Sequence, residues 1–516
     1  RVAGGTAYGL LIGQVVLDAV ALATACWLGF RCAGRAGLLG VAVTLGILTR
    51  AYGAFLLTLP WNPYLPVCWW VVFLLGAWSL LEDDPVAIPV VVVAGSFCMQ
   101  THIPYLGLVG GGVVALAGVL GVRMLRSPDR RRAYLPWLIG GALLGAVLWA
   151  PPVVDQFTRD PGNLATIREH FSHPPETPIG LGRGVRALLS QMDPVDLAAR
   201  TLVRDERRVP ATGSAVPGAV LVAAWGASAL WARRRGPRSL VHLDAVIGAA
   251  FVLGLISAAR IFGEVFYYLL LWAWAIAALM LMAVGWSVLE IARARASDPQ
   301  RVERTAVVAG VAVLVVNAIV FAVGAAGTDV QSPRLNASLT ALGPPTVDAL
   351  TARERAGGRG PYLVTWLPDP QAIGSAGFGL LDELDRNGFD VRAAVVFRPG
   401  ATRNHVIEPT EAALEVHLAT GEREITRRRG DRRWREIAAF DPRSASERVE
   451  FARLRSELIE ILQRGGLGDR VAQVDDNLFM LGLVAGLPPG AQPRIDRMLA
   501  IGVPSAVFLG PPGTDG

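Results

Sequence analysis

Several polar residues stand at the ends of apolar runs, where they could bind or activate a substrate. Asp155 and Gln156 follow the apolar run that ends in Trp149-Ala150-Pro151-Pro152, and Asn163 comes shortly afterwards. A carboxylate beside an apolar wall can act as a general base toward a hydroxyl group. Asp155 is therefore a candidate base, with an ordinary capping or loop carboxylate as the alternative interpretation.

Two arginines and one histidine are candidate ligands for a phosphate group. Arg50 lies inside an apolar run, where a guanidinium is costly unless it faces protein or water. Arg260 ends another such run, close to Glu264. Guanidinium groups match phosphate oxygens in pairs, and His102 could orient a phosphate or a sugar hydroxyl. The alternatives are snorkelling of Arg50, an Arg260–Glu264 ion pair and a structural hydrogen bond of His102.

Further polar and aromatic residues stand at neighbouring ends of the apolar runs. We expect them to line one substrate cavity at the outer membrane rim: Trp61, Asn62, Gln100, Tyr105, Asp155, Gln156, Asn163 and Glu264. The alternative for Trp61, and for Tyr64 in the same turn, is a place in the aromatic belt of a membrane protein.

The composition and the length of the apolar runs predict a membrane protein. Of the 516 residues, 52% are hydrophobic and only 18% are charged, whereas about a quarter of a typical soluble protein is charged. A membrane-spanning helix needs about 17–25 residues. Ten segments qualify, near 6–30, 37–59, 63–81, 86–102, 105–122, 134–150, 215–232, 239–259, 265–290 and 305–326. Their continuous apolar character favours helices over barrel strands, which alternate.

The positions of the arginines predict how these segments are oriented, because basic residues concentrate in cytoplasmic loops. If the first segment runs inward, the inner loops contain Arg31, Arg35, Arg123, Arg126, Arg130, Arg131, Arg132, Arg233, Arg234, Arg235, Arg238, Arg293, Arg295, Arg301 and Arg304. Arg260 is the single arginine in the short outer loops. The long loop 151–214 and everything after about residue 327 are then extracytoplasmic.

The polar C-terminal part reads as a separate domain. Residues 361–516 combine short β-type runs at 362–366 and 391–397 with helical patterns at 379–386 and 447–463, which indicates a small extracytoplasmic α/β domain. Residues 328–360, rich in Gly, Pro, Ala and Arg, are expected to be a linker. The predicted fold is thus an α-helical polytopic membrane domain over 1–327, followed by a linker and this α/β domain.

Several functional classes lack support in the sequence. The net charge of +6 comes from arginines that lie beside apolar segments, so it marks topology and does not indicate a nucleic-acid partner. No Walker loop, HExxH, GxSxG or zinc-ligand spacing occurs. An Asp-x-Asp pair of the kind used with nucleotide-sugars is also absent. No cofactor or metal site is predicted, and a requirement for a divalent cation stays open.

Taken together, these features resemble the C-type (GT-C) superfamily of integral membrane glycosyltransferases, in particular its large actinobacterial-type members. The resemblance covers residues 1–327 and rests on Trp61-Asn62-Pro63, Gln100-Thr101-His102, Trp149-Ala150-Pro151-Pro152 with Asp155-Gln156, and Pro161-Gly162-Asn163. Family members transfer a sugar from a polyprenyl-phosphate carrier to an acceptor at the outer face of the membrane.

The resemblance implies both partners and roles. The expected partners are membrane lipid, a polyprenyl-phosphate sugar and an envelope glycan or glycoprotein acceptor, at the plasma membrane. Arg50, Arg260 and His102 would hold the donor phosphate. The catalytic carboxylate of the family usually follows the first helix, and counting from the predicted topology places that loop before Arg1. We therefore expect an N-terminal helix and outer loop upstream, and Asp155 is only a substitute candidate for the base.

Two other classes of function fit the same segments. A lipid or solute transporter would use intramembrane acids such as Asp18, but such proteins often consist of paired halves, and no internal repeat is visible. A non-catalytic cell-envelope assembly protein would use the α/β domain to bind a cell-wall polymer or a partner. We expect the glycosyltransferase and keep these two as alternatives.

Overall fold

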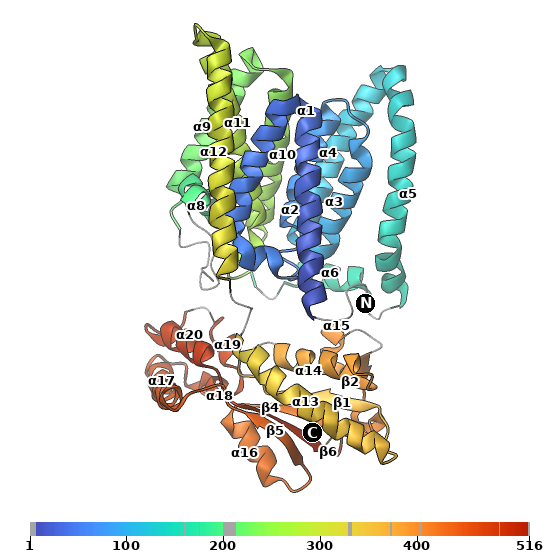
Figure 1. Ribbon diagram of the computed structural model, residues 1–516, viewed down its shortest axis with the longest axis vertical. Coiled ribbons are helices and arrows are strands. Elements are labelled where there is room, and N and C mark those ends of the chain that lie inside the picture. The colour runs from blue at the N-terminus through green and yellow to red at the C-terminus, as the bar shows by residue number, and fades with distance from the viewer. Residues whose placement is uncertain are drawn as a thin grey trace. The chain divides into compact units, whose positions relative to one another are not determined.

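The computed structural model describes residues 7–158, 161–174, 176–199, 213–328, 333–371, 374–401, 405–484 and 486–513. The chain is mostly helical and divides into two compact units, called unit 1 (Arg1–Asp329) and unit 2 (Val330–Gly516). Figure 1 shows helices throughout unit 1 and a sheet with helices in unit 2.

Unit 1 is built from apolar helices. They are α1 (Ala7–Thr58), α2 (Val67–Leu81), α3 (Ala87–Thr101), α4 (Pro104–Arg126), α5 (Pro128–Thr158), α9 (Val216–Arg235), α10 (Arg238–Ala259), α11 (Trp272–Arg295) and α12 (Pro299–Ala326). Among the described residues, six helices (α1, α4, α5, α10, α11 and α12) are long and apolar enough to cross a membrane, and α2 and α3 are shorter apolar helices. Unit 1 therefore has the character of a membrane protein.

The helix α1 folds back on itself. Ala33 and Gly34 leave the helical conformation, and Gly34 has φ 60° and ψ −143°, which suits a residue without a Cβ. A Cβ built on Gly29 would lie 2.9 Å from the carbonyl oxygen of Gly37 and 2.7 Å from Val41. In a straight helix, residues 29 and 37 would be roughly 12 Å apart. The chain thus reverses here, and α1 supplies two antiparallel apolar helices (Figure 1).

One end of unit 1 gathers the charges of several turns. The Asp83 carboxylate forms ion pairs with Arg123 (3.3 Å), Arg130 (2.9 Å) and Arg238 (3.9 Å). The Asp84 carboxylate forms one with Arg31 (2.5 Å). These arginines come from different loops that the positive-residue pattern assigned to one side. Their convergence on one acidic turn places those loops at the same end of unit 1.

The sequence placed residues 151–214 in one outer loop, and this prediction is wrong for the first part. The helix α5 continues to Thr158 with Pro151 and Pro152 inside it. Apolar helices in membranes tolerate proline because neighbouring groups can satisfy the freed carbonyls. Asp155 and Gln156 therefore stand on the last turns of α5.

The remaining described part of this region folds into the helical unit. It forms α6 (Asn163–Ser172), α7 (Gly180–Gln191) and α8 (Pro194–Ala199). The helix α7 has one buried face and leaves Leu181 exposed on the other. A Cβ on Gly184 would lie 2.8 Å from the backbone of Ala259 on α10, and the Ile179 amide donates to the Ile261 carbonyl at 2.9 Å. The region thus packs against α10 and the segment that follows it.

Unit 2 contains a six-stranded sheet with the order β3-β2-β1-β4-β6-β5. The strands are β1 (Tyr362–Thr365), β2 (Val391–Ala394), β3 (Val406–Ile407), β4 (Leu414–Thr420), β5 (Arg435–Phe440) and β6 (Ser505–Gly510). Strands β1 to β4 are parallel, and β6 is antiparallel to β4 and β5. Helices of unit 2 include α14 (Ser375–Arg386), α15 (Arg398–Ala401), α16 (Glu422–Gly430), α17 (Ala445–Arg464), α18 (Gln473–Asp476), α19 (Leu478–Leu481) and α20 (Ala491–Ile501). The predicted strands and helices of this domain are confirmed, although the second strand ends at Ala394.

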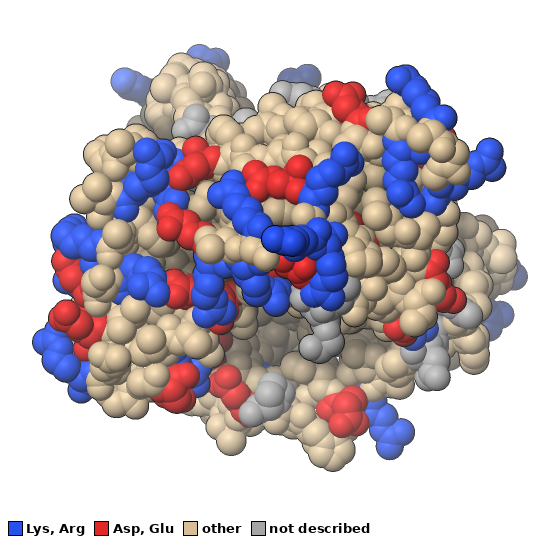
Figure 2. Space-filling model, turned by 90° about the horizontal axis from the view of Figure 1, so that it is seen from below, with Lys and Arg blue, Asp and Glu red and all other residues tan. Residues whose placement is uncertain are grey.

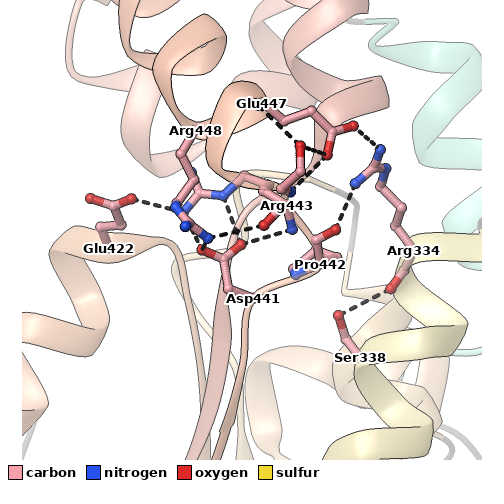
Figure 3. A network of polar contacts seen from close by, with 9 residues as sticks. Arg334, Ser338, Glu422, Asp441, Pro442, Arg443, Glu447 and Arg448 are labelled. Carbon is pink, nitrogen blue, oxygen red and sulfur yellow. Dashed lines mark hydrogen bonds and ion pairs between the residues drawn. The ribbon is translucent and has the colours of Figure 1, made fainter.

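The expected linker at 328–360 is wrong over most of its length, because Pro333–Arg355 form the helix α13. Leu342 and Leu350 of α13 are fully buried in the core of unit 2. Arg334 donates to the Pro442 carbonyl at 2.9 Å and pairs with Glu447 of α17 (Figure 3). The composition suggested a linker, but the spacing of leucines along one helical face provides the packing that makes it part of the domain.

The strand β5 and the helix α17 are joined by a buried arginine. The side chain of Arg443 is 3% exposed, and it contacts Asp441 at 2.8 Å and Glu422 at 2.8 Å. Its guanidinium also lies 5.4 Å from the ring centre of Phe451. Figure 3 shows this network beside the Arg334–Glu447 pair, so the junction of α13, β5 and α17 rests on paired charges.

Elsewhere on unit 2 the arginines pair with nearby carboxylates. Arg429 contacts Glu436 at 2.6 Å, and Arg433 contacts Asp431 at 2.6 Å. Figure 2 shows basic side chains beside acidic ones on the face that it draws. The charge of these arginines is therefore balanced locally.

Replacing Arg443 should destabilise unit 2 strongly. Arg443→Ala removes the hydrogen bonds of the buried guanidinium to Asp441 and Glu422, and we expect a loss of about 1.5–3 kcal/mol of unfolding free energy. The matched control is Arg453→Ala, which removes an exposed ion pair with Glu457 and should cost less than about 1 kcal/mol. Protease resistance of the full chain in increasing urea measures the stability of both variants. Equal losses of stability in the two would contradict the structural role of Arg443.

Candidate functional site

A group of buried polar side chains lies within the apolar helices of unit 1. Gln14 is 1% and Asp18 5% exposed, and the Gln14 amide donates to one Asp18 oxygen at 2.9 Å. Gln14 Oε1 and Asp18 Oδ1 have no hydrogen-bond partner. The Cys68 thiol, at the start of α2, lies near the Asp18 carboxyl. Buried polar atoms normally have partners, so this pair marks an unusual place.

The same region continues to the corner between α3 and α4. Tyr105 is 1% exposed, and neither its hydroxyl nor His102 Nε2 has a partner. The His102 and Tyr105 rings lie 6.3 Å apart, and the Trp70 ring meets Tyr105 edge-on at 5.8 Å. Cys68 and Trp70 both belong to α2, so this helix connects the two groups of residues. We call Gln14, Asp18, Cys68, Trp70, His102 and Tyr105 the polar cluster.

The buried atoms without partners make the polar cluster a candidate binding site. An unpaired buried polar group costs about 1–3 kcal/mol, and ionisable residues inside apolar helices usually serve a function. A polar ligand, or water, would restore the missing hydrogen bonds. The cluster offers acceptors on Gln14 and Asp18 and a hydroxyl on Tyr105, a set suited to hydroxyl-bearing ligands.

Arg50 is buried and held by protein groups. It is 4% exposed, its Nε donates to Asn317 Oδ1 of α12 at 2.7 Å, and its Nη2 donates to the Leu197 carbonyl of α8. The snorkelling interpretation is therefore wrong, because the side chain lies between α1, α8 and α12. A role in phosphate binding stays a prediction.

Asp155, Gln156 and Asn163 meet at the corner between α5 and α6. The side-chain amide of Asn163 donates to Asp155 Oδ2 at 2.8 Å, and the backbone amide of Leu164 donates to Gln156 Oε1 at 2.7 Å. These bonds fix the start of α6. Asp155 thus holds the side chain of Asn163, and its role as a base stays a prediction.

The aromatic residues of the turn between α1 and α2 contact the segment after α10. Trp61 meets Tyr64 at 4.8 Å and Tyr268 at 4.9 Å, both edge-on. The Tyr64 and Tyr267 hydroxyls are hydrogen-bonded. Asn62, next to Trp61, is exposed. This turn is thus tied to residues 267–268, as a structural aromatic group would be.

Arg260 and Glu264 do not form the ion pair that was the alternative for Arg260. Arg260 follows α10 and is exposed, and Glu264 is half-buried. Across the described ranges, no ion pair or side-chain hydrogen bond of Arg260 is found. Its guanidinium is therefore available at the surface of unit 1.

The predicted cavity residues fall into separate groups. Gln100, His102 and Tyr105 share the α3–α4 corner, and Gln100 links it to α5 by donating to the Leu148 carbonyl at 3.1 Å. In the part of the chain that the structure describes, no hydrogen bond, ion pair or ring contact joins any two of Arg50, His102 and Arg260. Sequence reasoning missed Gln14, Cys68 and Trp70. The spacing of Gln14 and Asp18, one helical turn apart inside an apolar run, was a signal that could have found the first.

Unit 2 holds a buried chain of polar groups that resembles a catalytic triad in composition. Thr365 Oγ1 lies 2.8 Å from His417 Nδ1, and His417 Nε2 lies 3.1 Å from Glu424 Oε1. However, His417 is 1% exposed, and the Thr365 hydroxyl also contacts Glu415 at 2.6 Å. Unlike the polar cluster, these side chains already have hydrogen-bond partners, so we interpret the chain as structural.

No metal site is visible in the described ranges, where no group of three or more His, Cys, Asp or Glu side chains could hold an ion. Comparison of the chain with protein-family models, with curated proteins and with solved structures finds no match.

The Tyr105 hydroxyl should contribute nothing to folding. Tyr105→Phe removes a buried atom without a partner, so we expect an unchanged or higher melting temperature of the protein in detergent. Tyr105→Ala leaves a cavity and should cost about 3–5 kcal/mol. Marked destabilisation by Tyr105→Phe would show that the hydroxyl has a partner in the folded protein and would remove it from the polar cluster.

The buried Glu424 should make unit 2 sensitive to acid. Burial raises its pKa, but hydrogen bonds from His417, Arg427 and Arg428 outweigh burial and lower the pKa from 4.5 to about 2. Stability from this carboxylate is complete above the unfolded pKa and is lost as the pH falls from about 4.5 toward 2, on the order of 3 kcal/mol.

Hydrogen exchange of the β4–α16 peptides in the full chain measures this loss, after correction for the intrinsic pH dependence of exchange. Glu424→Gln should lower their protection at pH 7 and flatten the acid response. An unchanged acid response in Glu424→Gln would contradict the assignment.

Proposed function

We propose that this chain is a membrane glycosyltransferase of the GT-C type, which transfers a sugar from a polyprenyl-phosphate-linked donor to a cell-envelope acceptor at the outer face. The observation that carries the proposal is the polar cluster, in which buried atoms of Gln14, Asp18, His102 and Tyr105 lack partners inside a unit of apolar helices. An amphipathic donor fits such a place, because its polyprenyl chain stays in lipid while its sugar and phosphate pair with polar groups.

The proposal includes a topology of ten crossings. The two halves of α1 supply two, and α2, α3, α4, α5, α9, α10, α11 and α12 supply the others. The end of unit 1 that holds the paired arginines of the Asp83–Asp84 turn would face the cytoplasm. The opposite end, with α6 to α8, and unit 2 would then be extracytoplasmic at the plasma membrane.

In the proposed reaction, the acceptor hydroxyl attacks the anomeric carbon of the donor with inversion. A carboxylate accepts the hydroxyl proton as the new C–O bond forms, and the polyprenyl phosphate leaves with the electron pair of the broken bond. Guanidinium groups stabilise the growing phosphate charge, a role that Arg50 and Arg260 would share. We assign the base to no residue of this chain, because the Asp155 carboxylate already accepts a hydrogen bond from the side-chain amide of Asn163.

One observation favours transport as a second candidate. The buried Asp18 carboxyl has a partnerless oxygen among the apolar helices, and such acids serve as proton relays in transporters. A transporter would move its substrate without breaking a bond, so product analysis separates the two candidates.

The test uses the full chain in proteoliposomes with labelled polyprenyl-phosphate pentoses and hexoses and an envelope glycan acceptor. We expect Arg50→Met to lower kcat/KM about 100-fold, as loss of a transition-state donor does. Arg50→Lys, which keeps the charge, should recover part of the activity. The control Arg304→Met, at the opposite end of the helices, should stay within about twofold of the parent.

Each variant is checked for an unchanged elution profile and melting temperature, so that misfolding is not read as lost chemistry. Full activity of a folded Arg50→Met protein would remove Arg50 from the site. Movement of an intact donor across the membrane, without transfer of its sugar, would favour the transporter.

A further inference from the structure

Unit 2 contains a pocket of about 560 Å³ at the carboxyl ends of β1 and β2. Leu367 follows β1, Phe397 follows β2, and Phe378 and Met480 come from α14 and α19. Open α/β sheets bind their ligands at this edge, and the volume lies within the range of small-molecule sites. The position and size of the pocket both suit a ligand.

The chemistry of the pocket disfavours a phosphate-bearing ligand. In nucleotide-binding sheets of this kind, a phosphate sits at the start of the helix after the first strand. Here a carboxylate occupies that place, since Asp369, 6% exposed, accepts from the Gly374 amide at 3.0 Å and from the Gln371 amide at 3.2 Å. A second carboxylate, Asp476, also lines the pocket. An anionic group would meet the Asp369 carboxylate on one side and, on the other, Asp476, which is paired with Arg423.

The pocket wall instead combines aromatic rings with a polar pair. Phe378 and Phe397 line it, and the Trp366 ring behind them stacks on Phe397 at 4.0 Å. Asp476 and Asn477 stand side by side in the wall; one Asp476 oxygen pairs with Arg423, and Asn477 Oδ1 accepts from the Met480 amide. Within the described ranges, the other Asp476 oxygen and the Asn477 amide nitrogen make no hydrogen bond. An acceptor and a donor are thus available next to an aromatic surface.

The rim of the pocket leaves apolar side chains in water. Leu367 is 51%, Val396 68% and Met480 42% exposed, and all three line the pocket. Exposed apolar groups gathered at one place usually mark a binding site. A ligand that covers them must have an apolar face, whereas Asp476 and Asn477 require hydroxyl or amine groups.

We propose that this pocket binds a neutral saccharide unit of an envelope glycan. A sugar ring presents an apolar face of C–H groups to Phe378 and Phe397, and it presents hydroxyls that donate to Asp476 and accept from Asn477. The site is separate from the polar cluster of unit 1 and does not require sugar transfer. Unit 2 would hold the glycan on which an enzyme in unit 1, or a partner protein, acts.

The test is saturation-transfer NMR on the full chain in nanodiscs, with short neutral oligosaccharides of arabinan, galactan and mannan as probes. Wild-type protein should give a signal with at least one probe. Val396→Arg, at an exposed rim position, should weaken the binding about tenfold or more, because it blocks the pocket without touching the core. The matched control is Val449→Arg, at a position that is 72% exposed on α17 and does not line the pocket, and it should bind as wild type.

A conservative variant tests the polar contact. Asn477→Asp keeps the oxygen that caps α19 but loses the amide donor, so binding should weaken about tenfold while the melting temperature stays unchanged. The proposal is overturned if Val396→Arg binds as wild type. It is also overturned if only cationic spermidine or phospholipid vesicles, and no neutral saccharide, give a signal. Absence of sugar transfer would refute the proposed function of unit 1 and leave saccharide binding measurable.

Discussion

Polar groups buried among apolar helices must find partners, and this constraint organises unit 1. At one end, the half-buried Asp83 and Asp84 form ion pairs with arginines from four separate segments. Arg50 satisfies the constraint by reaching Asn317 and the Leu197 carbonyl, which fastens α8 to the helices. The polar cluster does not meet it, since Gln14, Asp18, His102 and Tyr105 keep atoms without partners. The contrast between these places directs attention to the cluster as the site of binding.

Unit 2 handles its charges in a different way. Its arginines pair with carboxylates, and the buried Arg443 and Glu424 each sit in a network of several bonds. These networks tie helices to the sheet and leave the carboxyl edge of β1 and β2 free of a fixed positive charge in the pocket wall that is described. The wall is aromatic and acidic. Unit 2 is therefore better suited to neutral, hydroxyl-rich molecules than to nucleotides.

Much of the fold follows from local sequence, whereas the site depends on distant pairings. Long apolar runs dictate helices because lipid-compatible backbone must bond internally, and the strand and helix patterns after residue 361 were equally local. Two predictions were wrong because tertiary packing outweighed local composition. Pro151 and Pro152 lie within α5, and the buried leucines of the expected linker make it the helix α13. The Arg50–Asn317 bond joins residues 267 positions apart, and no local pattern reveals it. Asp18 was visible from its place in an apolar run, but its neighbour Cys68 belongs to another helix.

The central claim is that the polar cluster receives the head group of a lipid-linked sugar. Photo-crosslinking tests it most directly: a polyprenyl-phosphate sugar with a photoreactive group on the sugar is added to the full chain in native-like membranes. Mass spectrometry then identifies the labelled peptides. The account predicts labels on peptides that contain Gln14–Asp18, Cys68–Trp70 and His102–Tyr105, and competition by unlabelled donor. Labels confined to the exposed apolar surfaces of α5 and α12, at the level given by a photoreactive phospholipid, would contradict it.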